Sequence, residues 1–203
     1  MKTFGRLNLL LLFQIVYSTT KMFGDSILAS NTPIQKDLEQ YGEIMMDNYA
    51  RIGAGLQKGW VISVPEQYEQ NKYPIPSTVI MDGGGNDVNG FKYDCEAFND
   101  NCRNSIDGLV VILKDLFDTM RKDGVDNIIY MGFYYLGRLN NSIDYATDKL
   151  LQICKPIDHC YHVDLRNVTV QTGWDGVHPV TSSYHDIATE VWKRKIHYNI
   201  PLT

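Results

Sequence analysis

Three short motifs follow one another along the chain, and together they contain the groups that serine-based acyl transfer requires. Gly24-Asp25-Ser26 supplies a hydroxyl, Gly84-Gly85-Asn86-Asp87 supplies an amide donor, and Asp175-Gly176-Val177-His178-Pro179 supplies an Asp/His pair. A serine hydroxyl is a poor nucleophile until a nearby base takes its proton, and the oxyanion that then forms needs hydrogen-bond donors. The ordered set of motifs makes serine-dependent acyl chemistry the leading hypothesis.

Each candidate residue has a definite role in that chemistry. His178 is the expected base, and Asp175, three residues earlier, is placed to hold one ring nitrogen while the other faces Ser26. The expected oxyanion donors are the backbone N–H of Ser26, the N–H of Gly55 and the side-chain amide of Asn86. Gly55 has no side chain to block a close approach.

Taken singly, these motifs have simpler interpretations. An isolated Asp-x-x-His is typical of a capped helix start, and glycines 83–85 are typical of a tight turn after a strand. A phosphate-binding loop is a third interpretation of the glycines, but no Gly-Lys-Ser/Thr follows them. The turn and the catalytic interpretations are compatible.

Composition indicates an ordinary globular protein. The chain has 203 residues, of which 44% are hydrophobic and 21% charged, a size that suits one domain with its own core. The formal net charge is -5, and lysine and arginine are scattered along the sequence. The sequence contains no cluster of basic residues that would predict nucleic-acid binding.

The first 18 residues have the pattern of a secretory signal peptide. Lys2 and Arg6 precede an apolar run over residues 7–17, and Val16 and Ser18 place small residues where a signal peptidase would cut. The run is too short to span a bilayer. The alternative is a buried first strand that continues into Gly24. We therefore expect a single domain over 19–203, secreted or periplasmic, without stable membrane insertion once the signal is removed.

Four cysteines form two close pairs in the sequence, Cys95 with Cys102 and Cys154 with Cys160. An even count in an exported chain favours two local disulfides. Reduced core thiols are the alternative if the leader is retained. Histidines flank Cys160, but the spacing matches no usual zinc pattern, so we expect no metal.

Apolar periodicity predicts alternating strands and helices. Strands are expected over 19–23, 48–52, 78–81, 127–131 and 161–165, and helices over 34–46, 104–122, 143–153 and 180–195. The segment after the second strand, through residue 73, is expected to be helical or irregular and to be interrupted by Pro65. The segment after the third strand is expected to be a loop that carries the first cysteine pair. Strands separated by helices predict a parallel sheet covered on both faces. Loops at the carboxyl ends of such strands collect reactive groups, and the three motifs converge there.

These motifs resemble the sequence blocks of the SGNH hydrolases, also called GDSL esterases and lipases. The resemblance covers essentially the whole of 19–203 and rests on Gly24 to Ile27, Gly55, Gly84 to Asp87 and Asp175 to Pro179. It implies a three-layer α/β/α sandwich with a five-stranded parallel sheet in flavodoxin-like order. By position, Ser26 would be nucleophile and oxyanion donor, with Gly55 and Asn86 as the other donors, His178 as base and Asp175 as its partner.

The agreement is weakest in two places. Ile27 replaces the usual leucine, a volume-conserving change. The second block offers two glycines, and Gly53 is an alternative donor to Gly55. Four aromatic residues lie near the expected site by chain position and are candidates for lining an acyl groove, although packing under loops explains each equally well: Trp60, Tyr134, Tyr135 and Trp174.

The resemblance implies an exported monomeric serine esterase that needs no cofactor. Such a member is similar to broad esterases, thioesterases and lysophospholipases, so the expected substrate is a small-molecule, lipid or glycan ester. Three alternatives remain open. A carbohydrate O-deacetylase or an acyltransferase would use the same residues, and a catalytically silent glycan- or lipid-binding module would keep only the fold.

Overall fold

The computed structural model describes residues 19–29, 31–90 and 92–202. Five parallel strands form one sheet in the order β2-β1-β3-β4-β5. This is the flavodoxin-like order, so the fold class predicted from the sequence is confirmed. The strands are β1 Thr20–Phe23, β2 Asp47–Asn48, β3 Thr78–Met81, β4 Asn127–Met131 and β5 Cys160–Val163.

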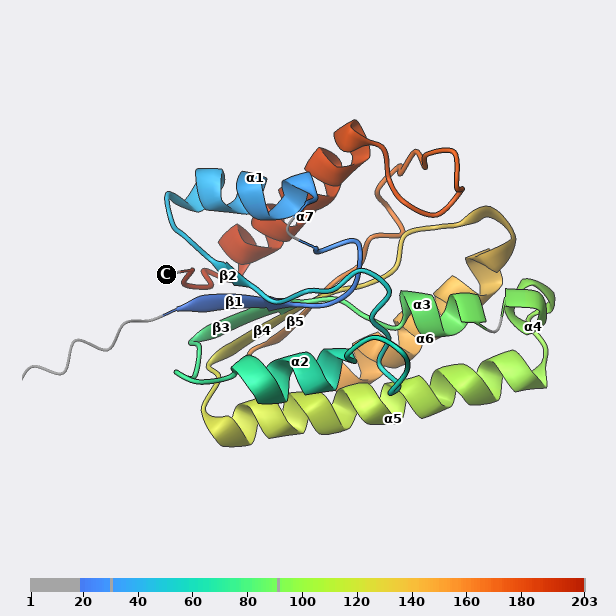
Figure 1. Cartoon of the computed structure of the whole chain (residues 1–203), viewed down its shortest axis with the longest axis horizontal. Coiled ribbons are helices and arrows are strands. Elements are labelled where there is room, and N and C mark those ends of the chain that lie inside the picture. The colour runs from blue at the N-terminus through green and yellow to red at the C-terminus, as the bar shows by residue number, and fades with distance from the viewer. Residues whose placement is uncertain (1–18, 30, 91, 203) are drawn as a thin grey trace, which may run out of the picture.

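Helices cover both faces of the sheet (Figure 1). One layer contains α1 Pro33–Gly42 and α7 Thr181–His197, and the other contains α2 Val64–Asn71, α5 Asp100–Asp123 and α6 Asn140–Cys154. Two hydrophobic clusters fill the space between the sheet and these layers. The central strands β1, β3 and β4 are buried along their whole length, as expected for parallel strands covered on both faces.

Local capping explains where the helices differ from the expected ranges. The helix expected over 34–46 ends at Gly42 because Glu43 takes a left-handed conformation, with φ 52°. Pro65 does not interrupt a helix but lies in the first turn of α2, where its missing N–H costs nothing. Ser63 caps α2 in a capping box with Glu66. The second strand is also shorter than expected, since only Asp47–Asn48 pairs with β1.

The segment after β3 is helical, where a loop was expected. It forms α3 Gly85–Gly90 and α4 Lys92–Ala97, and α5 begins at Asp100 because the Asn99 side chain accepts the N–H of Cys102. A disulfide between Cys95 and Cys102 joins α4 to α5. Short polar stretches with glycine do not display the apolar period from which helices are predicted, which is why sequence reasoning missed α3 and α4.

The second disulfide joins Cys154 at the end of α6 to Cys160 at the start of β5. Both cysteine pairs are therefore those predicted from the sequence. A short 3-10 helix, Gly137–Leu139, leads from β4 into α6. The predicted signal peptide over 1–18 lies outside the described residues. Within the part that is described, no helix is long and apolar enough to cross a membrane.

Candidate active site

The three sequence motifs meet at the carboxyl edge of the sheet. Ser26 follows β1, Asn86 lies in the first turn of α3 just after β3, and His178 lies in the loop between β5 and α7. A parallel sheet brings loops from the same end of different strands together, although these residues are far apart in sequence. This topology brings Ser26 and His178 into contact, although 152 residues separate them in the sequence.

A continuous hydrogen-bonded chain links the serine, histidine and aspartate. His178 Nε2 lies 2.8 Å from Ser26 Oγ, and His178 Nδ1 lies 2.5 Å from Asp175 Oδ2. An ionised Asp175 accepts the Nδ1 proton, which leaves Nε2 free to accept from the serine hydroxyl. Hydrogen bonds from the Val177 N–H and the His178 side chain and N–H lower the pKa of Asp175 to about 2. Asp175 is thus a carboxylate at neutral pH.

The loop that carries Asp175 and His178 is fixed at several points. An antiparallel bridge between Thr172 and Pro179 closes its base. The Tyr134 hydroxyl donates to the Val177 carbonyl at 2.7 Å. Asp175 Oδ1 also accepts the N–H groups of Val177 and His178, at 2.9 and 3.0 Å. These contacts set the direction of the imidazole before any substrate arrives.

The segments that carry Asn86 and Gly55 are joined by hydrogen bonds. Asn86 Nδ2 donates to the Ala54 carbonyl at 2.8 Å, so its amide group rests on the peptide that joins Ala54 to Gly55. The Asp87 carboxylate accepts the N–H of Leu56 at 2.7 Å. A Cβ atom at Gly55 would lie 2.8 Å from both carboxylate oxygens of Asp87, so only glycine fits there.

Gly53 occupies a different position. It has φ 81°, lies on the exposed surface, and forms part of the turn closed by the Ala54 N–H to the Arg51 carbonyl. The peptide that joins Ala54 to Gly55 therefore lies against the Asn86 amide, whereas Gly53 lies in the exposed turn.

Two buried side chains that sequence reasoning missed hold the turn of the serine motif. Gln67 of α2 accepts the Gly24 N–H and donates to the Gly24 carbonyl, both at 2.9 Å. Asp82, which follows β3, accepts the Asp25 N–H at 2.7 Å. A Cβ atom at Gly24 would lie 1.8 Å from Asp82 Oδ1, so this close approach requires the glycine. An acidic residue directly after an apolar strand was the available signal for Asp82.

Asp25 and Asp82 form a buried pair of carboxyl groups next to Ser26. Burial raises the pKa of Asp25, and burial together with the charge of Asp25 raises the pKa of Asp82 well above its usual value. Asp82 Oδ2 is buried and has no hydrogen-bond partner in the described part of the chain.

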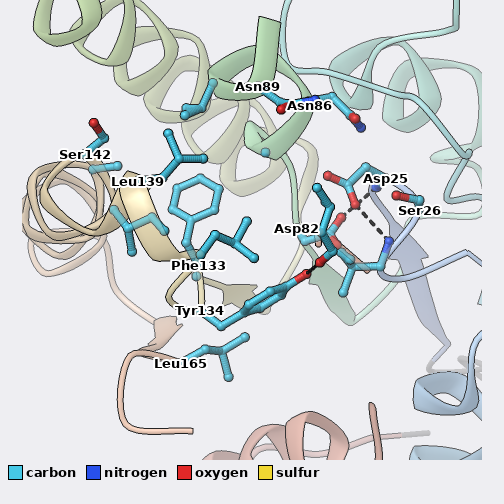
Figure 2. A pocket seen from close by; sticks show the side chains of 18 of the residues that line it. Asp25, Ser26, Asp82, Asn86, Asn89, Phe133, Tyr134, Leu139, Ser142 and Leu165 are labelled. Carbon is cyan, nitrogen blue, oxygen red and sulfur yellow. Dashed lines mark hydrogen bonds between the residues drawn. The ribbon is translucent and has the colours of Figure 1, made fainter. Parts of the chain in front are cut away.

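A cavity of about 270 Å³ opens beside Ser26. Figure 2 shows Asp25, Ser26 and Asp82 on one side of it and Leu139 and Ser142 on the other. Among the four aromatic candidates, Tyr134 lines this cavity.

The other three aromatic candidates point elsewhere. Tyr135 is partly exposed and donates its hydroxyl to Asp144 at 2.8 Å. Trp60 and Trp174 are fully exposed and do not line the cavity. Of these four aromatic residues, the structure therefore brings one, Tyr134, to the cavity beside Ser26.

Solved structures match the fold at low sequence identity. The esterase EstA from a Pseudoalteromonas species aligns with a TM-score of 0.66 and 13% identity over 91% of this chain and 100% of that one. An extracellular lipase from Streptomyces rimosus aligns at 0.59 and 12%, covering 87% and 98%. A Slackia heliotrinireducens protein assigned as an SGNH hydrolase aligns at 0.58 and 14%, covering 87% and 98%. No protein-family model and no curated protein matches the sequence. The fold is that of the SGNH hydrolases.

Proposed function

We propose that this chain hydrolyses carboxylic esters or thioesters through an acyl-enzyme on Ser26. The observation that carries the proposal is the hydrogen-bonded chain from Ser26 through His178 to Asp175. As Ser26 Oγ bonds to the acyl carbon, His178 Nε2 takes the hydroxyl proton, and Asp175 stabilises the imidazolium. His178 then gives that proton to the leaving alkoxide or thiolate as its bond to the acyl carbon breaks.

Water completes the reaction in the second half. His178 takes a proton from water as the oxygen attacks the acyl carbon, and it returns that proton to Ser26 Oγ when the ester bond to the enzyme breaks. The same base thus acts once in each half, and the chain regains its starting state. An acceptor alcohol in place of water would make the reaction an acyl transfer.

The proposed oxyanion donors are the N–H groups of Ser26 and Gly55 and the side-chain amide of Asn86. The contact of Asn86 with the Ala54 carbonyl supports this set, because it uses one proton of the amide and leaves the other for substrate. Gln67 and Asp82 fix the turn before Ser26, so the donors do not have to reorganise during the reaction. The solved structure of EstA is that of an esterase inhibited by monoethylphosphonate, which supports ester hydrolysis as a function of this fold.

We also propose that the protein is exported. The basic and apolar pattern over 1–18 supports a cleaved signal, and the two disulfides are typical of an oxidising compartment. N-terminal sequencing of the secreted protein tests this, and a mature chain that begins near residue 19 is expected. Retention of Met1 in the protein isolated from cells would contradict the proposal.

The decisive experiment compares hydrolysis of p-nitrophenyl esters by wild type, Ser26→Ala and His178→Ala. Each variant is expected to lose about 10⁴-fold or more in kcat. Ser105→Ala is the matched control, because Ser105 is a half-buried serine of α5 whose hydroxyl donates to the Asn101 carbonyl and which does not line the cavity beside Ser26. Circular dichroism checks that all variants are folded. Equal activity in wild type and Ser26→Ala would refute the serine mechanism.

A further inference from the structure

We infer that Asn167 is a site of N-linked glycosylation and that Asn140 is not. The sequence contains two Asn-x-Ser/Thr motifs, one over 140–142 and one over 167–169, and neither has proline at its second position. Such a motif is an acceptor only in an exported chain, so the inference rests on the proposed export and goes beyond the proposed hydrolysis. The structure distinguishes the two motifs by the surroundings of their residues.

The motif over 167–169 begins in an exposed turn that follows β5. The Val168 N–H donates to the Leu165 carbonyl at 3.0 Å, which makes Arg166 and Asn167 the two central residues of the turn. Leu165 is buried, and Val168 packs against one of the two hydrophobic clusters. The two ends of the turn are therefore anchored in the core, while Asn167 and Thr169 are exposed.

The turn is held in place without the Asn167 side chain. The Arg166 guanidinium donates, at 2.6, 3.2 and 3.1 Å, to the carboxylates of Asp164, Asp144 and Asp148. The Arg166 N–H also donates to Asp164 Oδ1 at 3.0 Å. The Asn167 amide group makes no hydrogen bond within the described part of the chain. Its nitrogen can therefore carry a substituent without the loss of a contact that holds the fold.

The motif over 140–142 lies in a packed part of the chain. Asn140 begins α6 and is half-buried, and its Oδ1 is fully buried. Ser142, the hydroxyl residue of this motif, is 1% exposed and donates its hydroxyl to the Cys95 carbonyl at 2.6 Å. An oligosaccharide is a bulky, hydrated substituent that belongs on the surface. Attached to Asn140, it would have to leave the packed start of a helix, so we expect no modification there.

The modification joins the Asn167 side chain to an oligosaccharide that is carried on a lipid diphosphate. Asn167 Nδ2 forms a bond to the anomeric carbon of the first sugar and loses one proton. The bond from that carbon to the diphosphate oxygen breaks, and its electron pair leaves with the lipid diphosphate. The step therefore needs no oxidant or reductant, and its co-reactant belongs to the secretory pathway that the proposed export would use.

The oligosaccharide would lie at the same edge of the sheet as Ser26 but outside the cavity. The turn follows β5 as Ser26 follows β1, so both are at carboxyl ends of parallel strands. Leu165 lines the cavity, whereas Asn167 and Thr169 do not. We therefore expect the same kcat/KM toward p-nitrophenyl esters with and without the oligosaccharide.

The test is secretion of the full chain from mammalian cells, followed by peptide-N-glycosidase treatment and mass spectrometry of peptides. Wild type is expected to carry one oligosaccharide, and the enzyme converts the modified asparagine to aspartate, which locates it at residue 167. Asn167→Gln and Thr169→Ala are expected to abolish the modification. Thr169→Ser keeps the hydroxyl that the motif requires and is expected to retain it. Asn140→Gln is the matched control and is also expected to retain it.

The pair of Thr169 variants keeps Asn167 itself, so the test does not depend on whether Asn167→Gln folds. Secreted wild type without an oligosaccharide, or an oligosaccharide that persists in Thr169→Ala, would overturn the inference. Wild type that stays in the cell with its leader attached would overturn the proposed export, and the inference with it. Hydrolysis that depends on Ser26 is measured separately, so neither result decides the proposed catalytic function.

Discussion

His162 provides a pH-dependent test of how the core is built. This residue of β5 is 6% exposed, stacks on Tyr130 with ring centroids 5.9 Å apart, and has no partner for either ring nitrogen among the described residues. Burial lowers the pKa of His162 to about 4 from its ordinary 6.5. The charge of Asp164 acts against this shift, and those of Arg194 and Arg166 add to it.

The sign and size of the effect follow from the two pKa values. Because the folded-state pKa is below that of the unfolded chain, the unfolded state binds the proton first as the pH falls. Above pH 6.5, His162 is neutral in both states and its titration does not lower the free energy of unfolding. As the pH falls from 6.5 toward 4, the free energy of unfolding decreases. A shift of this size corresponds to about 3 kcal/mol in the free energy of unfolding at the acid limit.

The assay is urea unfolding of wild type and His162→Leu at pH values from neutral to mildly acidic, with the disulfides intact. Wild type alone is not sufficient, since the raised pKa values of Asp25 and Asp82 act in the opposite direction. The difference between wild type and His162→Leu removes these shared contributions. We expect wild type to lose about 2 to 3 kcal/mol relative to the variant between neutral pH and pH values near the folded pKa.

Val163→Ala is the matched control on the same strand, because Val163 is equally buried and has no titrating group. Its difference from wild type is expected to be independent of pH. If the His162→Leu difference is also constant with pH, the ring is hydrated or hydrogen-bonded in solution, and the reasoning from its burial is wrong.

Three further predictions concern the site and the cysteines. Asn86→Ala is expected to lower kcat by about 10²–10³-fold with little change in stability, because it removes one oxyanion donor; full activity would refute that role. Asp82→Asn keeps an acceptor for the Asp25 N–H and is expected to retain activity, whereas Asp82→Ala leaves that N–H unpaired and destabilises the fold by about 1–3 kcal/mol in thermal or urea unfolding. Equal stability of the two variants would contradict a stabilising role for the hydrogen bond from the Asp25 N–H to Asp82. Thiol titration of the denatured, unreduced protein is expected to find no free cysteine, and four free thiols would contradict both disulfides.

The sequence by itself predicted the parallel sheet and named the residues of the candidate site. The strands over 78–81 and 127–131 have the predicted bounds because buried parallel strands are short apolar runs between polar or glycine-rich turns. The amphipathic period of α5 predicted most of its length. Ser26, Asn86, Asp175 and His178 were predicted from motif order, and the two cysteine pairs from their short spacing. All of these features depend on neighbours within a few residues or on one short motif.

Tertiary structure alone decided which groups support and surround the serine. Gln67 reaches Gly24 across 43 residues, and Asp82 reaches Asp25 across 57 residues. The exposure of Trp60 and Trp174, and the position of Tyr134 in the cavity, follow from how the loops lie over the sheet edge. Local sequence periodicity does not predict these contacts, because the side chains come together only when helices from both layers pack on the sheet. The cavity beside Ser26 exists for the same reason, since its walls come from α3, α6 and the loops that follow β1, β3, β4 and β5.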